Sequence, residues 1–239
     1  MFEKQQFMKA PIPFTKEFTN RNHAPMFRKS FTLESCGTAR LSVCGLGIGY
    51  YYINGRKVSG DLFTAPQSDY TKTLWYNEYD VTGLLQEGEN CIAVWLGNGW
   101  YNEDFETGWR FDEAVWRDVP KCMLRLEVDG VCTVVSDDSW KCQPDSAIYF
   151  NGLRSGEYFD ARLYDPEWVD TDYDDSSWVQ AVKDDNPPAG VFRKCPCEPI
   201  RECRVYACKE VIPAGEGRFI FDFGQNMSGY IRLRIAGDC

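Results

Sequence analysis

The sequence contains a single histidine, His23, and no apolar run that approaches the roughly 20 residues a membrane-spanning helix needs. One histidine argues against a histidine-based catalytic triad and against a multi-histidine metal site. Residues 1–7 lack the basic start and the continuous apolar stretch of a secretory signal. We therefore expect a soluble, cytoplasmic protein with no membrane partner.

Basic residues are scarce, with 26 Lys and Arg against 36 Asp and Glu, and the net charge is −10. Phosphate binding needs a concentrated basic surface, so a nucleic-acid partner is not expected. A neutral ligand such as a sugar remains compatible with this charge.

The cysteines do not have the pattern of a disulfide framework. Their number, 11, is odd, and many lie in apolar runs such as that ending at Cys44, which indicates buried free thiols. Four of them lack the paired two-residue gaps of zinc knuckles: Cys195, Cys197, Cys203 and Cys208. No cofactor is expected. Loop oxygens leave calcium open, although no Asp-x-Asp-x-Asp-Gly loop is present and no ligand set is identified.

Short runs rich in Val, Ile, Tyr, Phe and Trp alternate with Gly, Asn, Asp and Pro clusters, which predicts an all-β sandwich. Residues 27–33 alternate apolar and polar side chains, as a half-buried strand does. Residues 91–96 are apolar throughout, which predicts a central strand covered on both faces.

Two dipeptides, Asn54-Gly55 and Asp129-Gly130, predict tight hairpin turns between strands. The glycine-rich run at residues 45–49 could suggest a phosphate-binding loop. Such a loop requires a helix directly after it, whereas residues 50–53 have the pattern of a strand. We therefore do not expect phosphate binding there.

Residues 184–190 have the composition of a domain boundary, and further strands are expected at 204–208, 218–223 and 230–235. The predicted organisation is a leader over residues 1–24 and a β-sandwich over 25–186. Residues 187–239 are predicted to hold a linker and the start of a second, partial β-sandwich.

Two acidic segments could carry glycoside chemistry, which usually takes a pair of carboxyl groups. For the first we favour a solvated loop face; its acids are Glu103, Asp104, Glu106, Asp112 and Glu113. In the second, Glu157 and Asp160 accompany Arg162, and a structural salt bridge is as good an interpretation as ligand contact. Spacing alone identifies no catalytic pair.

Trp100 and Tyr101 follow a predicted strand and resemble the aromatic platforms on which sugar rings stack. Asn98 and Asn102 flank them and could donate hydrogen bonds to hydroxyl groups. The alternative is a core tryptophan at the rim of a sheet.

Several sequence segments together resemble the N-terminal domain of bacterial α-L-rhamnosidases and the start of the β-sandwich domain that follows it. They are Tyr52-Ile53-Asn54-Gly55-Arg56-Lys57-Val58, Gly97-Asn98-Gly99-Trp100-Tyr101, Gly156-Glu157-Tyr158-Phe159-Asp160-Ala161-Arg162 and Phe221-Asp222-Phe223-Gly224-Gln225-Asn226. The resemblance implies a jelly-roll-like, galactose-binding-like fold. It also implies an inverting enzyme whose acid and base belong to an (α/α)₆ barrel, so no catalytic residue is assigned here.

The resemblance therefore predicts a non-catalytic accessory region of an α-L-rhamnosidase, an enzyme that releases terminal L-rhamnose, with the barrel beyond Cys239. Its expected partners are that barrel and a rhamnose-containing carbohydrate, and a homodimer is left open. In some relatives such a sandwich binds rhamnose with calcium. The candidate contact residues are Asn98, Trp100, Tyr101, Asn102, Glu157 and Asp160. The alternatives are a stand-alone carbohydrate-binding module and a structural scaffold without a ligand.

Overall fold

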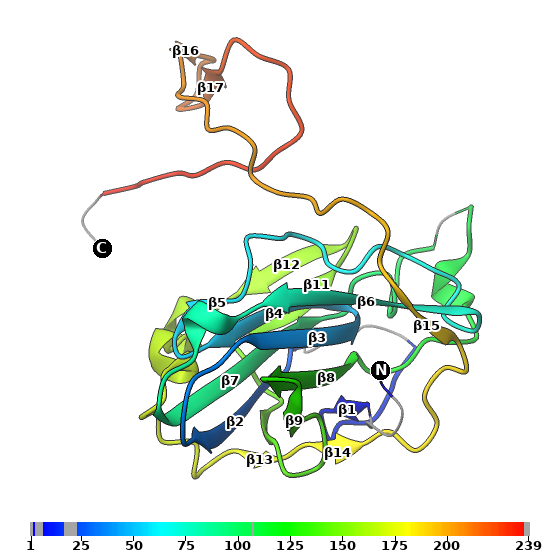
Figure 1. The fold of residues 1–239 in the computed structure, drawn as a ribbon. Coiled ribbons are helices and arrows are strands. Elements are labelled where there is room, and N and C mark those ends of the chain that lie inside the picture. Colours follow the sequence, from blue (N-terminus) through cyan, green and yellow to red (C-terminus); the bar gives the residue numbers. More distant parts are fainter. Residues whose placement is uncertain (1, 3–6, 17–22, 107, 237–239) are drawn as a thin grey trace. The chain divides into compact units, whose positions relative to one another are not determined.

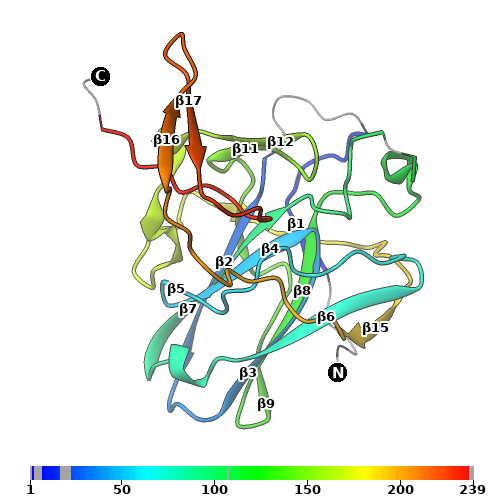
Figure 2. The same ribbon diagram turned by 90° about the horizontal axis from the view of Figure 1, so that it is seen from above.

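The computed structural model describes residues 2, 7–16, 23–106 and 108–236. Contacts divide the chain into two compact units, Met1–Arg201 and Glu202–Cys239. The first unit consists of two β-sheets packed face to face, with a small hairpin beside them (Figures 1 and 2). The predicted all-β sandwich is confirmed.

The first sheet, sheet A, has seven strands. Their spatial order, with β9 (Val131–Val135) paired to β8, is β14 (Val182–Lys183), β1 (Met8–Lys9), β8 (Lys121–Val128), β3 (Ala39–Leu46), β6 (Thr73–Asp80) and β15 (Val191–Lys194). Neighbours in sheet A are antiparallel except for β15, which runs parallel to β6.

The second sheet, sheet B, has six strands, all antiparallel to their neighbours. Their order is β13 (Val179–Gln180), β10 (Lys141–Gln143), β2 (Met26–Leu33), β7 (Gly88–Gly97), β4 (Ile48–Ile53) and β5 (Arg56–Lys57). Strands β11 (Ile148–Gly152) and β12 (Gly156–Phe159) form the separate hairpin.

Helical structure in the described residues is limited to short 3₁₀ turns. These are η1 (Thr82–Leu84), η2 (Phe111–Glu113), η3 (Ala161–Leu163) and η4 (Pro166–Val169). No helix in this part of the chain is long and apolar enough to cross a membrane.

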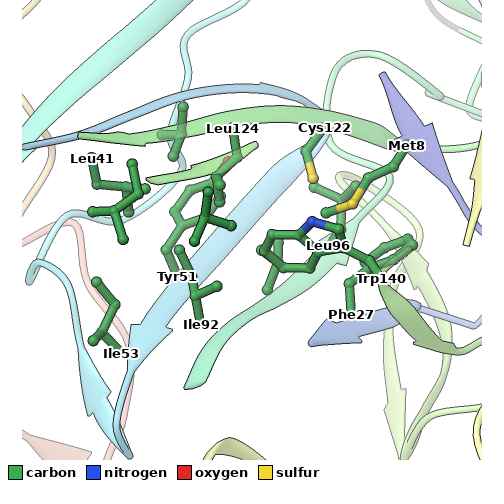
Figure 3. Packing of buried hydrophobic residues seen from close by; sticks show 14 of the residues in the cluster. Met8, Phe27, Leu41, Tyr51, Ile53, Ile92, Leu96, Cys122, Leu124 and Trp140 are labelled. Carbon is green, nitrogen blue, oxygen red and sulfur yellow. The ribbon is translucent and has the colours of Figure 1, made fainter. Parts of the chain in front are cut away.

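The main core lies between the two sheets, where each strand contributes every second side chain. Sheet A contributes Leu41 and Leu124, which meet Phe27 and Ile92 of sheet B, and Trp140 closes one end (Figure 3). All five are completely buried. Burial of one such side chain contributes about 1.5–3 kcal/mol, so this layer supplies much of the stability.

Strand β7 is apolar on both faces because both faces are covered, as its sequence predicts. Ile92 and Val94 point into the core between the sheets. Cys91 and Ala93 point to the outer face of sheet B, where Trp168 of η4 packs against them. The central position of the strand is thereby confirmed.

Both predicted hairpin turns are present. Asn54 and Gly55 have φ of 50° and 77° between β4 and β5, and Asp129 and Gly130 have φ of 48° and 77° between β8 and β9. Positive φ at both central residues defines a type I′ turn, which explains the choice of Asn-Gly and Asp-Gly.

The boundaries differ from the predicted ones in two places. Strand β1 lies within the expected leader, yet it pairs with β8 and β14 and so belongs to sheet A. The division into compact units falls after Arg201 rather than after residue 186, because residues 191–201 pair and bond with the first unit. Leader residues 1, 3–6 and 17–22 lie outside the described part of the chain.

In the second unit, β16 (Glu210–Pro213) and β17 (Phe219–Asp222) form an antiparallel hairpin. The strand expected at 218–223 is thus present. The strands expected at 204–208 and 230–235 are not formed, and the described residues offer no partner strand to satisfy their backbone groups.

The ten described cysteines are all free thiols. Cys44, Cys91, Cys122 and Cys142 are buried in the sandwich, as expected. Five others are exposed, so burial does not account for them: Cys36, Cys132, Cys197, Cys203 and Cys208.

Candidate functional site

Four of the six candidate residues lie on the loop after β7, which contacts the β11–β12 hairpin, and the other two lie on or directly after β12. Residues 98–118 form this loop and will be called the rim loop. Glu157 lies on β12 and Asp160 directly follows that strand. Cross-strand pairing places Asn151 of β11 opposite Glu157, and Asn151 is also the residue that Asn98 contacts.

Asn98 anchors the rim loop to the hairpin and is completely buried. Its backbone N–H donates to Oδ1 of Asn151 at 2.7 Å, and its side-chain amide donates to the Asn151 carbonyl at 2.8 Å. Its Oδ1 accepts a hydrogen bond from the Asn102 amide at 2.8 Å. Asn98 therefore has no exposed group for a sugar hydroxyl, contrary to the expectation for this residue.

Asn102 and Tyr101 are also interior residues. The Oδ1 of Asn102 accepts from Nε and Nη2 of Arg117 at 3.2 and 3.1 Å. Tyr101 is 1% exposed, and its ring meets the edge of Tyr70 with centroids 5.2 Å apart. A stacking platform needs an open ring face, so the structure corrects the interpretation of Tyr101 to that of a core aromatic.

Among the four candidate residues of the rim loop, Trp100 is the one that is only partly buried. The Arg154 guanidinium carbon lies 4.9 Å from the Trp100 ring centroid and 5.8 Å from the Trp109 ring centroid. Trp109 is 71% exposed. The hairpin turn thus places a cation between two tryptophans of the rim loop, an arrangement in which cation and π-face attract each other.

Glu103 is the acid of the rim loop for which the predicted exposure to solvent is wrong. Its side chain is 0% exposed rather than solvated, and its carboxylate accepts from Nη1 of Arg154 at 3.1 Å. Burial raises the pKa of Glu103, while the N–H of Phe105 and the charge of Arg154 oppose that shift. Nearby, the Ser155 hydroxyl donates to Asp104 at 2.8 Å and ties the loop to the hairpin a second time.

Asp160 is engaged by its own segment. It accepts hydrogen bonds from the backbone N–H and the Nε of Arg162 at 3.0 and 2.9 Å and caps the N-terminus of η3. The side-chain hydrogen bond from Arg162 lowers the pKa of Asp160 to about 2, so this carboxylate is ionised at neutral pH. Two interpretations of this segment were open, a structural salt bridge and contact with a ligand. The structure shows the salt bridge, between Asp160 and Arg162. Glu157 is exposed on β12.

Sequence reasoning missed Trp109 and Arg154, which complete the stack around Trp100. No local pattern marks them, because Arg154 lies 54 positions after Trp100 and only the fold of the hairpin brings the two together. In the described part of the chain, no group of three or more His, Cys, Asp or Glu side chains is placed to hold a metal ion. Calcium binding through other oxygens stays a prediction.

Comparison with known proteins identifies relatives over most of the chain. The family model for the α-L-rhamnosidase N-terminal domain matches residues 34–204. An α-L-rhamnosidase from Formosa agariphila is 32% identical over 222 residues, which cover 89% of this chain and 23% of the relative. The chain therefore spans less than a quarter of that protein.

Two solved structures have the same fold as most of this chain. The native α-L-rhamnosidase from Aspergillus terreus superposes with a TM-score of 0.81 at 26% identity, over 94% of this chain and 26% of that one. The Streptomyces avermitilis α-L-rhamnosidase complexed with L-rhamnose gives a TM-score of 0.76 at 28% identity, over 91% and 21%.

Proposed function

The chain belongs to the family of α-L-rhamnosidase N-terminal domains, and we propose that it serves as the non-catalytic accessory region of an α-L-rhamnosidase. The single observation that carries this proposal is the extent of the match. The family domain accounts for the β-sandwich, whereas each curated relative is more than four times as long as the segment it shares with this chain. Hydrolysis of rhamnosides is thereby assigned to residues outside this sandwich, on the (α/α)₆ barrel that the family resemblance implies.

The acids of the candidate site support a non-catalytic role. Inverting glycosidases need two carboxyl groups about 6.5–9.5 Å apart on either side of the scissile bond. Glu103 is buried against Arg154, and Asp160 is held by Arg162. Neither carboxylate is free to face a partner acid across a sugar.

We assign the carbohydrate contact of this proposal to Trp100 and Trp109. Their partly open rings offer the apolar faces on which pyranose rings stack, and the rhamnose-containing substrate of the parent enzyme is the ligand we propose. Burial of Asn98, Tyr101 and Asn102 removes three of the other expected contacts and favours the alternative, a structural scaffold without a ligand, whereas Glu157 stays exposed on β12.

Two measurements on the purified chain test the proposal. We expect no release of nitrophenol from a nitrophenyl α-L-rhamnoside; measurable turnover would overturn the non-catalytic assignment. Titration calorimetry with L-rhamnose, with and without calcium, then compares Trp100→Ala, Trp109→Ala and Phe63→Ala, an exposed aromatic in another loop. If the heat of binding is lost in Trp100→Ala and Trp109→Ala but kept in Phe63→Ala, the rings of the rim loop contact the sugar. If the unmodified chain gives no heat of binding, the structural scaffold is supported.

A further inference from the structure

Residues 191–201 stay attached to the first unit: residues 191–195 run along one edge of sheet A, and residues 200 and 201 contact the loop at residues 61 and 62. Strand β15 pairs in parallel with β6, with Val191 opposite Thr73 and Lys194 opposite Tyr76 (Figures 1 and 2). The backbone N–H of Cys195 donates to the carbonyl of Tyr76 at 2.8 Å and extends this ladder by one bond.

Side chains reinforce the near end of this segment. The Phe192 ring stacks on the buried Phe7 with centroids 6.1 Å apart. Lys194 Nζ lies 2.5 Å from a carboxylate oxygen of Glu78 on β6. Phe192 and Lys194 lie two positions apart on β15 and so point to the same face of the sheet, where an aromatic contact and an ion pair hold the strand.

The far end is held separately, by the loop that contains residues 61 and 62. The Leu62 N–H donates to the Ile200 carbonyl at 2.8 Å, and Nε of Arg201 donates to Oδ1 of Asp61 at 2.7 Å. The Asp61 side chain is 7% exposed whereas that of Arg201 is 60% exposed. A carboxylate so far removed from water needs a cationic partner, so this pair is more than a solvent-screened surface contact.

We propose that residues 191–201 form a strap that fixes where the chain leaves the β-sandwich, with the Asp61–Arg201 ion pair as its latch. The second compact unit begins at Glu202, the residue directly after the latch. A linker of about ten untethered residues would let the following chain sample an end-to-end span of about 15–20 Å. The strap removes this freedom and gives the chain one point of departure from the sandwich.

Backbone hydrogen exchange in the full 239-residue chain tests the latch, because each end of the strap has its own reporter amide. The Leu62 N–H reports the far end and the Cys195 N–H reports the near end. The Leu124 N–H, bonded to the Ser136 hydroxyl at 2.9 Å in the core, reports the sandwich itself. The variants are Arg201→Glu, Arg201→Lys and the control Arg193→Glu, an exposed strap arginine that forms none of the described ion pairs.

We expect Arg201→Glu to speed exchange of Leu62 by about tenfold and that of Cys195 by less, while Leu124 keeps its protection. Arg201→Lys retains the charge and should change Leu62 exchange by less than about twofold, as should Arg193→Glu. Unchanged Leu62 exchange in Arg201→Glu would overturn the proposal. So would equal acceleration of Leu62 and Leu124, because the pair would then stabilise the whole sandwich rather than a strap. The strap needs no carbohydrate, so these outcomes are independent of the rhamnosidase assignment.

Discussion

Asn98 and Asn151 bind each other through two hydrogen bonds, one to the side chain and one to the backbone of Asn151, at 2.7 and 2.8 Å. This pairing joins the start of the rim loop to β11 of the hairpin. Because Asn98 is completely buried and Asn151 is partly buried, the pair determines how the loop that carries Trp100 is held.

The Asn98→Ala variant should lower the free energy of unfolding by about 1–3 kcal/mol, because the Asn151 carbonyl loses its side-chain donor in a buried setting. Urea unfolding monitored by tryptophan fluorescence measures this loss. The same substitution at the exposed Asn186 serves as control and should be nearly neutral. If both variants unfold at the same urea concentration, the anchoring role of Asn98 is wrong.

This anchor also shows what could be predicted from the sequence. Period-two patterns and Asn-Gly or Asp-Gly turns are local signals, and they identified central strands of both sheets, such as β7 and β8, but not the short strands β1 and β15. Burial at the ends of strands depends on what packs over them from elsewhere in the chain. The motif around Trp100 therefore located the candidate site, but burial of Asn98 and Tyr101 depends on β11 and on the residues around Tyr70.

The glycine-rich run at residues 45–49 illustrates the same limit. Its sequence argued against a phosphate loop but gave no positive reason for the glycines. In the structure Gly47 has a φ of 124°, and a Cβ there would lie 2.2 Å from the Gly97 carbonyl oxygen on β7. The glycine is required by close approach of two backbones in sheet B, which only the strand register reveals.

Gly47→Ala should therefore destabilise the sandwich by about 3 kcal/mol, since the clash is with backbone that cannot rotate away. Gly130→Ala is the matched control: its φ is also positive, at 77°, but no atom lies within 4 Å of the added Cβ. We expect the control to cost about 1 kcal/mol. Thermal unfolding of the two variants measures the difference, and equal melting temperatures would show that conformational strain alone decides both.

Lys121, the first residue of β8, is completely buried, and its ammonium contacts Asp184 and, at 2.6 Å, Asp118. Burial alone would raise the pKa of Asp118, but the hydrogen bond and charge of Lys121 outweigh it and the pKa is lowered. A carboxyl whose folded pKa is depressed stabilises the protein above its unfolded pKa and loses that contribution as the pH falls through the folded value.

Lys121→Met should cost about 3 kcal/mol near neutral pH, because it leaves buried carboxylates short of a partner. The variant should also lose less stability than the unmodified chain when the pH is lowered from about 7 to about 3, since the part of the Asp118 pKa depression that Lys121 causes is lost, while Val119 and Lys9 still lower the pKa. Urea unfolding at both pH values measures the two effects. Lys183→Met, at a half-exposed lysine of β14, should change neither; a similar loss in this control would contradict the buried network.

Arg154 contacts both the carboxylate of Glu103 and the ring of Trp100. Its removal should make the stability of the protein more dependent on pH. Burial already raises the pKa of Glu103, and the charge of Arg154 limits the rise. In Arg154→Met that pKa should climb further. A carboxyl whose folded pKa is raised contributes its stability below the unfolded pKa and loses it as the pH increases. The variant should therefore resemble the unmodified chain near about pH 4 and fall behind it progressively toward about pH 7.

Urea unfolding across this pH range, with fluorescence of the rim tryptophans as the signal, measures the divergence. The double variant Arg154→Met/Glu103→Gln provides the control, because a neutral amide in the same space cannot ionise and the pH-dependent part of the loss should vanish. A constant difference between Arg154→Met and the unmodified chain at every pH would mean that Arg154 acts through packing on Trp100 and Trp109 alone. The stack of cation and rings would then be apolar cover for the loop, and the 3.1 Å contact with Glu103 would contribute nothing to its stability.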